Sequence, residues 1–155
     1  MPTLTTCLWF DDAALDAAEF YVALFPNSAV TNVFRTADDA VLTVNWTLDG
    51  APFMAINGGP LFPHTEAFSV FLGCEDQAEA DHYWDALLAD GGEPSQCGWL
   101  RDRFGISWQV VPAGLHELLG DPDPARAAAA HDAMMQMSRL DLAGMRAAAD
   151  AATPA

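Results

Sequence analysis

The chain has 155 residues, 52% of them hydrophobic, and a formal net charge of −16 from 22 acidic and 6 basic residues. This length supports one good core, or two small modules that share a core, but not two independent domains. All six basic residues are arginine, and the absence of lysine excludes Schiff-base, P-loop and kinase-type mechanisms that need a lysine amine. A chain with this much negative charge is repelled by phosphate backbones and anionic lipid. Nucleic-acid and membrane partners are therefore not expected.

The location and redox state of the protein are predicted from what the sequence lacks. No apolar run approaches the roughly 18 residues of a membrane span, and the N-terminal stretch has neither a basic leader nor a cleavage motif. We therefore expect a cytoplasmic protein. Cys7, Cys74 and Cys97 form no C-x-x-C motif, which favours reduced, mostly buried thiols. Cys97 falls in a predicted strand without a neighbouring base, so a structural role is favoured over a nucleophilic one.

The first half of the chain is predicted to run strand, helix, then three strands. Thr3 to Phe10 is β-prone and ends at Asp11 and Asp12, which are good N-cap residues for a helix over 12–25. Strands follow over 29–35, 41–48 and 52–56, and Asp49-Gly50 is a strong hairpin turn between the last two.

The second half repeats this order. A strand over 67–73 leads to Glu75-Asp76, which opens a second amphipathic helix, and strands follow over 96–101 and 105–111. When the two halves are aligned with an offset of 63 residues, Tyr83 and Trp84 correspond to Phe20 and Tyr21. Both predicted helices therefore carry an aromatic pair at equivalent positions. The shared order indicates two copies of one strand-helix-strands module. Asp102, between two arginines in the last turn, is interpreted as a turn residue with local ion pairing of little energetic value.

The last strand has two different faces. Alternation places Ile106, Trp108 and Val110 on one face and Ser107, Gln109 and Val111 on the other. The first face is predicted to be core, with Trp108 packed under a helix. The second carries two polar side chains, which is typical of a strand that lines a cavity.

After Pro112 the composition changes to alanine, methionine and acidic residues. Asp123-Pro124 predicts a helix start, the following methionines an apolar stripe, and Asp141 caps a last short helix. We expect these helices to pack on the body or on a partner chain, because they are too short to persist alone.

Four segments of the sequence resemble the PhnB-like branch of the vicinal oxygen chelate superfamily, which also includes glyoxalase I, bleomycin-resistance proteins and extradiol dioxygenases. The segments are LWFDDAALDAAEFYVALFPNS, FMAINGGP, QCGWLRDRFGISWQVVP and LLGDPDPARA. The resemblance implies an α+β fold in which two βαβββ modules form an open half-barrel sheet around a cavity, followed by C-terminal helices. It also implies a homodimer. The expected organisation is a single domain with modules over about 1–62 and 63–112 and a helical extension over about 113–150.

The resemblance also locates the positions at which metal-dependent members of the superfamily hold their ion. Those positions correspond here to Leu4, Ala55, Ser69 and Gln109, of which only Gln109 is a plausible ligand. A slip in the alignment offers Thr5, Thr6, Met54 or Asn57, and none of these restores a site. A divalent ion of this class needs three or four His, Glu or Asp donors, so we expect no metal and no cofactor.

Several uncharged or aromatic residues are candidates for lining the cavity. His64, in the loop that enters the second module, is a candidate base or gate, with a solvated loop residue as the simpler interpretation. His82, His116 and His131 fall on predicted helices without metal-binding spacing. The cavity candidates are Asn57, His64, Ser69, Ser107, Gln109, Trp46 and Trp99, although core packing is the favoured interpretation of the two tryptophans. Apart from His64, these polar side chains do not titrate near neutral pH, which suits orienting a ligand better than moving protons.

The leading hypothesis is a protein of this superfamily that binds a small, partly apolar molecule in a metal-free cavity, with no assignable reaction, so enzyme activity stays open. The first alternative is a metal-dependent lyase, isomerase or dioxygenase that uses Gln109. The second is a non-catalytic structural or regulatory homodimer. Some relatives carry a demethylubiquinone methyltransferase label, but no glycine-rich turn of the kind that cradles a nucleotide-type cofactor supports that activity here.

Overall fold

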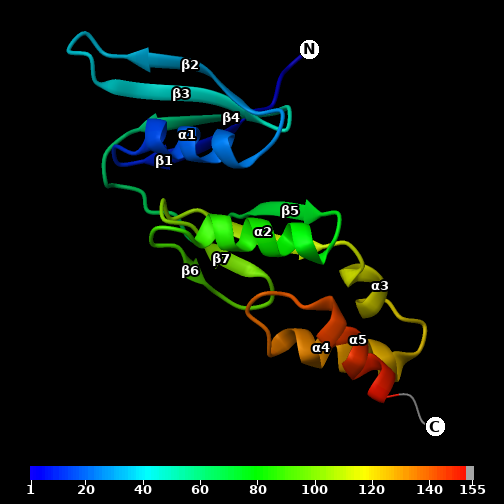
Figure 1. Ribbon diagram of the computed structural model, residues 1–155. Helices are drawn as coiled ribbons and strands as arrows, with labels where there is room; N and C mark the ends of the chain where they lie inside the picture. The colour runs from blue at the N-terminus through cyan, green and yellow to red at the C-terminus, as the bar shows by residue number, and fades with distance from the viewer. Residues whose placement is uncertain (153–155) are drawn as a thin grey trace. The chain divides into compact units, whose positions relative to one another are not determined.

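The computed structural model describes residues 1–152. Its contacts divide the chain into two units, with the boundary between His64 and Thr65. Each unit contains one four-stranded sheet and a helix that packs on it, so the chain has the expected α+β class with open sheets (Figure 1). No helix within residues 1–152 has the length and apolar character needed to cross a membrane.

The first unit contains β1 (Thr6–Phe10), α1 (Ala14–Leu24), β2 (Ala29–Arg35), β3 (Val41–Leu48) and β4 (Ala51–Asn57). The sheet order is β1-β4-β3-β2, with β1 parallel to β4 and the other neighbours antiparallel. Asp49 and Gly50 both have left-handed φ angles, 44° and 79°, as a two-residue hairpin turn requires. The predicted strands 29–35 and 41–48 are confirmed.

The core of the first unit lies between α1 and one face of its sheet. Val44 and Ala55 are 0% exposed and lie opposite each other on β3 and β4. Trp46 is 1% exposed, and its ring stacks on Phe53 and lies near Tyr21 of α1. These side chains face the helix because alternation puts every second residue of β3 and β4 on that side.

The predicted cap of α1 by Asp11 and Asp12 is wrong. The helix begins at Ala14, and the N-cap residue Ala13 makes no side-chain cap. Instead the Asn57 Oδ1 atom accepts a 2.9 Å hydrogen bond from the Ala14 backbone N–H. The parallel pairing of β1 with β4 carries the end of β4 to the start of the helix, so a residue 43 positions away provides the cap.

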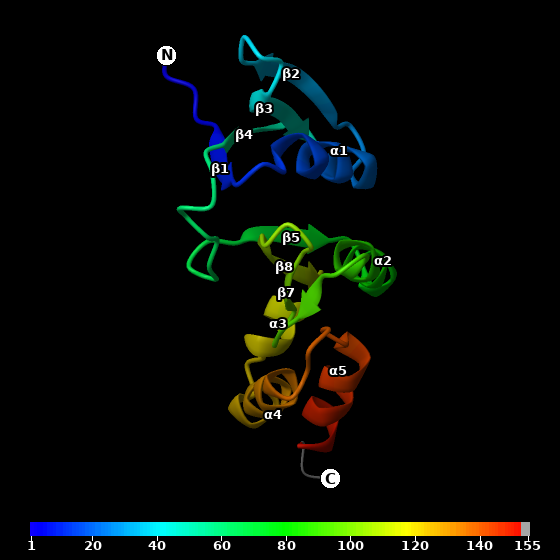
Figure 2. The same ribbon diagram turned by 90° about the vertical axis from the view of Figure 1, so that its left-hand side faces the viewer.

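The second unit repeats this topology. It contains β5 (Val70–Cys74), α2 (Gln77–Leu88), β6 (Glu93–Pro94), β7 (Trp99–Arg101) and β8 (Ser107–Pro112). The sheet order is β5-β8-β7-β6, and the first three of these strands are labelled in Figure 2. The first strand again pairs in parallel with the last, as in the first unit. The two helices begin 63 positions apart, at Ala14 and Gln77, which agrees with the repeat read from the sequence.

The strand predicted over 96–101 is shorter than expected, and Cys97 lies in a turn rather than a strand. Cys97 and Gly98 have φ angles of 57° and 84°, outside the extended region. Their backbone N–H groups donate to the carbonyls of Met137 and Ser138. The C-terminal segment therefore fixes this turn, which the local sequence could not indicate.

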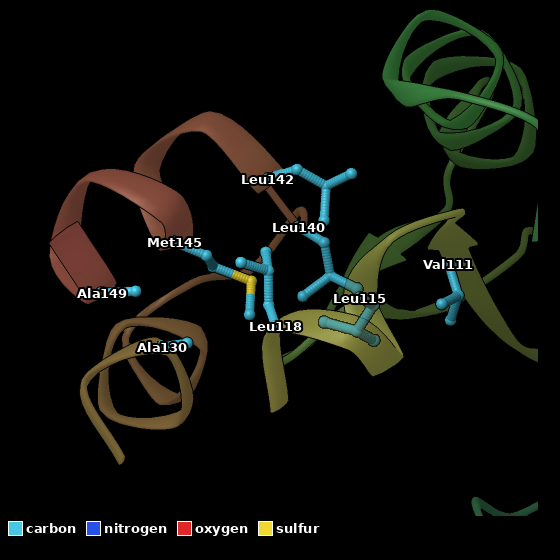
Figure 3. Packing of buried hydrophobic residues seen from close by; sticks show 8 residues of the cluster. All are labelled: Val111, Leu115, Leu118, Ala130, Leu140, Leu142, Met145 and Ala149. Atoms are coloured by element: carbon cyan, nitrogen blue, oxygen red, sulfur yellow. The ribbon is translucent and has the colours of Figure 1, made fainter. Parts of the chain in front are cut away.

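Three further helices follow the sheet: α3 (Leu115–Leu119), α4 (Pro124–Met135) and α5 (Leu142–Ala151). Asp123 and Asp141 accept hydrogen bonds from the second residue of α4 and α5, as predicted, and Asp76 caps α2. The helices enclose a cluster of apolar side chains (Figure 3), which consists of Val111, Leu115, Leu118, Ala130, Leu140, Leu142, Met145 and Ala149.

The Gln77 side chain fastens this helical extension to α2. Its Nε2 atom donates to the Leu140 carbonyl at 2.7 Å, and its Oε1 atom accepts from the Leu142 N–H at 3.0 Å. Arg139 adds ion pairs to Asp81 and Asp85 on the same helix. The extension therefore packs on the rest of the second unit through its apolar cluster. It is also held by the hydrogen bonds between the Gln77 side chain and the backbone of Leu140 and Leu142.

Candidate functional site

The two faces of β8 differ as the sequence predicts. Ile106, Trp108 and Val110 are 1–2% exposed, and α2 packs against this strand. On the opposite face Gln109 is half-buried, whereas Ser107 and Val111 are buried. We call this opposite side of the β5-β8-β7-β6 sheet the amide face.

Gln109 lies at the centre of one row of side chains on the amide face. Its strand neighbours in register are Phe71 on β5 and Trp99 on β7. Directly paired residues project to the same side of a sheet, so an amide lies between two aromatic side chains. Phe71 is 55% exposed and Trp99 is half-buried, so neither ring belongs to the core.

A hydrogen bond fixes the Gln109 amide. Its Nε2 atom donates to the Ser69 hydroxyl at 2.9 Å, across 40 residues of sequence. The amide has one acceptor atom besides its N–H groups. With Nε2 turned to Ser69, the Oε1 atom is the group through which Gln109 can receive a donor from a bound molecule.

The charges near this row are paired. Arg101 follows Trp99 by two residues and lies beside Ser107 in register, so it shares the amide face. Its Nη2 atom is 2.6 Å from a Glu93 carboxylate oxygen. The face therefore offers hydrogen bonding and apolar contact rather than a free charge.

The superfamily's metal-binding positions do not form a ligand set here. Ser69 contributes a hydroxyl, which is a poor ligand for a divalent ion, and Gln109 contributes an amide, the one plausible ligand of the set. Ala55 is fully buried on the helix side of β4, so the open side of that strand carries Met54 and Ile56 instead. Within residues 1–152 no three His, Cys, Asp or Glu side chains lie together in a way that could hold an ion.

Three of the cavity candidates, Trp46, Asn57 and His64, belong to the first unit. The expectation that Trp46 lines a binding face is wrong, because the ring is 1% exposed against α1. Asn57 uses both ends of its amide in structural bonds, to the Ala14 N–H and to the Val41 carbonyl. His64 has its Nε2 atom 2.6 Å from the Trp9 carbonyl and its ring near Phe10. A carbonyl only accepts, so Nε2 carries the hydrogen and a neutral His64 has an unprotonated Nδ1.

Sequence reasoning missed two important residues. Phe71 shares its face with Ser69 by period-two alternation, and this signal could have been read from the strand itself. Asp102 is 2% exposed, and its carboxylate accepts hydrogen bonds from the N–H groups of Phe104 and Ile106 and from the Trp108 indole. Asp102 is a turn residue, as interpreted, but the small energetic value given to it is wrong, since it is buried and organises the hairpin from the inside.

The buried cysteine of this unit is unreactive. Burial raises the pKa of the Cys74 thiol to about 11, and the carboxylates of Glu79 and Asp76 act in the same direction. At neutral pH this side chain is a neutral thiol packed at the end of β5. It takes no part in the chemistry of the amide face.

Comparison with known proteins identifies the family. A family described as 3-demethylubiquinone-9 3-methyltransferase matches residues 2–111. A PhnB protein of Bacillus cereus, described as a candidate methyltransferase of that name, is 30% identical, with a TM-score of 0.66 over 72% of this chain and 100% of that one. No match is found among curated proteins.

Two more distant structures share the fold. A Pseudomonas aeruginosa protein is 18% identical, with a TM-score of 0.60 over 72% of this chain and 98% of its own. The fosfomycin resistance protein FosX of Listeria monocytogenes, solved as a point mutant with Mn(II) and a phosphonic acid, is 14% identical, with a TM-score of 0.53 over 69% and 88% of the two chains. The family match ends before α3, so the helical extension lies outside it. The chain belongs to the family described as 3-demethylubiquinone-9 3-methyltransferase, the PhnB-like branch of the vicinal oxygen chelate superfamily.

Proposed function

We propose that the protein binds a small, partly apolar molecule on the amide face, without a metal ion. The observation that carries this proposal is the row Phe71–Gln109–Trp99, in which a fixed amide lies between two aromatic side chains that the core does not use. Such a surface orients a ligand by a few hydrogen bonds and by apolar contact. No reaction is assigned, because none of these three side chains transfers a proton near neutral pH. Ser69, Ser107 and Gln109 are the polar members of the proposed site.

The methyltransferase activity in the family description is not part of the proposal. A nucleotide-type cofactor is usually held by a glycine-rich turn between a strand and a helix. The described chain has three turns from a strand to a helix: Asp11 to Ala13 before α1, Glu75-Asp76 before α2 and Ala113-Gly114 before α3. The first two contain no glycine and are acidic, which disfavours an anionic cofactor, and the third has a single glycine before a helix of five residues, so none is glycine-rich.

We further propose that the protein works as a cytoplasmic homodimer, as the family resemblance implies. Size-exclusion chromatography with light scattering tests the dimer directly, and a monomer at micromolar concentration would overturn it.

A ligand screen with matched variants tests the binding role. A specific ligand raises the unfolding temperature by mass action, and Gln109→Ala should abolish that shift. Gln136→Ala, at an exposed residue that ends α4, is the matched control and should keep it. A shift that survives in Gln109→Ala would place the site elsewhere and overturn the proposal.

Elemental analysis separates this proposal from a metal-dependent lyase, isomerase or dioxygenase. The protein should be purified without chelators and measured for divalent metals. We expect far less than one ion per chain. About one tightly held ion per chain would overturn the metal-free site.

A further inference from the structure

We propose that the ligand of the amide face is a flat, uncharged aromatic molecule that carries an O–H or N–H donor. Its rings would lie over the Gln109 amide in contact with Phe71 and Trp99, and its donor would bond to the Oε1 atom of Gln109. This inference rests on the proposed binding role and names the chemical class of the ligand.

The two rings have free surfaces for such a partner. Phe71 is 55% exposed although it lies inside a strand, and Trp99 is half-buried. Within residues 1–152 neither ring pairs with another aromatic side chain. Neighbouring exposed aromatic rings on one sheet face form the kind of apolar surface that binding sites use.

The spacing of the two rings fits one flat molecule. Phe71 and Trp99 lie on strands that flank β8, so their backbones are two strand spacings apart, about 10 Å. The Gln109 side chain lies between the two rings, so a flat molecule would lie over the amide and contact both rings across this span. A saturated ring system is thicker and lacks the π contact.

The Phe71 ring lies toward the end of β5, over a residue without a side chain. Gly73, the next residue of β5 on this face, has no side chain, and the Phe71 ring is the nearest group to the position where a Cβ would lie, at 3.7 Å. A glycine inside a strand often marks the close approach of another molecule to the backbone. Val111, the partner of Gly73 in register, is 7% exposed and belongs to the apolar cluster of the extension, so the proposed site ends here.

The polar contacts specify the type of hydrogen bond. One N–H of the Gln109 Nε2 atom is engaged with Ser69, and the Oε1 atom is the acceptor that a donor of the ligand can use. The nearby Arg101 is paired with Glu93, and the chain carries a net charge of −16, so an anionic ligand has no counter-charge on this face. A neutral phenol or aromatic amine has the matching chemistry.

Three naphthalene-type probes test this class on the full chain. The probes are 2-naphthol, its methyl ether, and the saturated alcohol decahydro-2-naphthol, each titrated by calorimetry. We expect 2-naphthol to bind at least tenfold more tightly than either of the other two. The ether loses the donor, and the saturated alcohol loses ring stacking.

Variants connect that preference to the proposed residues. Phe71→Leu and Trp99→Leu should each weaken 2-naphthol binding by about three- to tenfold, since each removes one stacking partner. Gln109→Leu should bind 2-naphthol and its ether equally, because the acceptor is gone. Phe68→Leu, at a 44% exposed phenylalanine before β5 and outside the row, is the control and should bind as the native protein does.

The outcomes separate this inference from the binding role itself. Equal binding of the saturated alcohol, still dependent on Gln109, would overturn the aromatic class and leave the proposed function in place. No binding of any probe up to its solubility limit would also overturn the aromatic class, while the broad ligand screen decides the binding role. Probe binding that none of the Phe71, Trp99 and Gln109 variants changes would overturn both.

Discussion

The Asp102 Oδ2 atom accepts a 2.8 Å hydrogen bond from the Trp108 Nε1 atom inside the hairpin between β7 and β8. Both residues are 2% exposed. The other carboxylate oxygen of Asp102 accepts from the Phe104 and Ile106 N–H groups, which fixes the turn. One buried carboxylate therefore holds both the turn and the largest side chain on the helix side of β8, and this sets how Gln109 is presented on the other side.

We predict that Asp102→Asn lowers the free energy of unfolding by about 2–3 kcal/mol. The asparagine side chain has an NH2 group in place of one carboxylate oxygen, so one of the buried N–H groups that bond to Asp102 loses its acceptor. Urea denaturation followed by circular dichroism measures the change. Asp132→Asn, at an 86% exposed side chain, is the control and should change stability by less than about 0.5 kcal/mol. A loss below about 1 kcal/mol for Asp102→Asn would contradict a structural role for the carboxylate.

The two buried tryptophans should differ in their tolerance of phenylalanine. Trp46 has a buried Nε1 atom without a hydrogen-bond partner, whereas that of Trp108 is bonded to Asp102. In Trp46→Phe the lost packing is partly offset by removal of an unsatisfied N–H, which costs about 1–3 kcal/mol when buried. Trp108→Phe loses packing and also leaves the buried Asp102 carboxylate without the hydrogen bond from the indole N–H. We expect Trp108→Phe to be the less stable variant by at least about 1.5 kcal/mol in chemical denaturation, and equal losses would refute the assignment.

Gln77→Ala should loosen the C-terminal extension. The change removes the bonds from the Gln77 amide to the Leu140 carbonyl and the Leu142 N–H, which hold the start of α5. We expect faster tryptic cleavage after Arg139, which is 47% exposed, and a loss of about 1–3 kcal/mol of global stability. Gln136→Ala is the control with a native cleavage rate. Unchanged proteolysis in Gln77→Ala would mean that the apolar cluster alone fixes the extension.

The cysteines should react at different rates. The raised pKa of Cys74 leaves about one thiolate in a thousand at pH 8, whereas Cys7 is exposed. We expect a disulfide reagent at pH 8 to modify Cys7 first and to leave Cys74 unmodified until the protein unfolds. Mass spectrometry of digested samples identifies the modified residue. Early labelling of Cys74 would show that the end of β5 opens readily.

The same thiol gives a pH dependence of stability with a defined sign. The pKa of Cys74 is about 11 in the folded protein and near the ordinary value of 9.0 in the unfolded chain. As pH rises through 9 to 11 the unfolded chain loses this proton first, so stability is unaffected below pH 9 and falls above it. Cys74→Ala should lack this part of the alkaline decrease, and identical slopes for both proteins between pH 9 and 11 would contradict it.

Local patterns were sufficient for most of the fold. The strands 29–35 and 41–48, the Asp49-Gly50 turn and the caps at Asp76, Asp123 and Asp141 all follow from interactions within a few residues, so propensity and spacing predict them. The 63-residue repeat was visible for the same reason, because duplicated helices keep their aromatic pairs. The two faces of the last strand also follow from alternation alone.

Only the tertiary structure decided which side chains share a location. Asn57 caps α1 from the end of β4, Gln77 fastens α5 from α2, and Phe71 and Trp99 flank Gln109 through strand register. These partners are separated by tens of residues, so no local pattern contains them. The sequence by itself determined the modules and the faces of their strands, since those depend on short-range geometry. The amide face depends on which strands pair, and pairing is fixed only when the whole unit folds around its core.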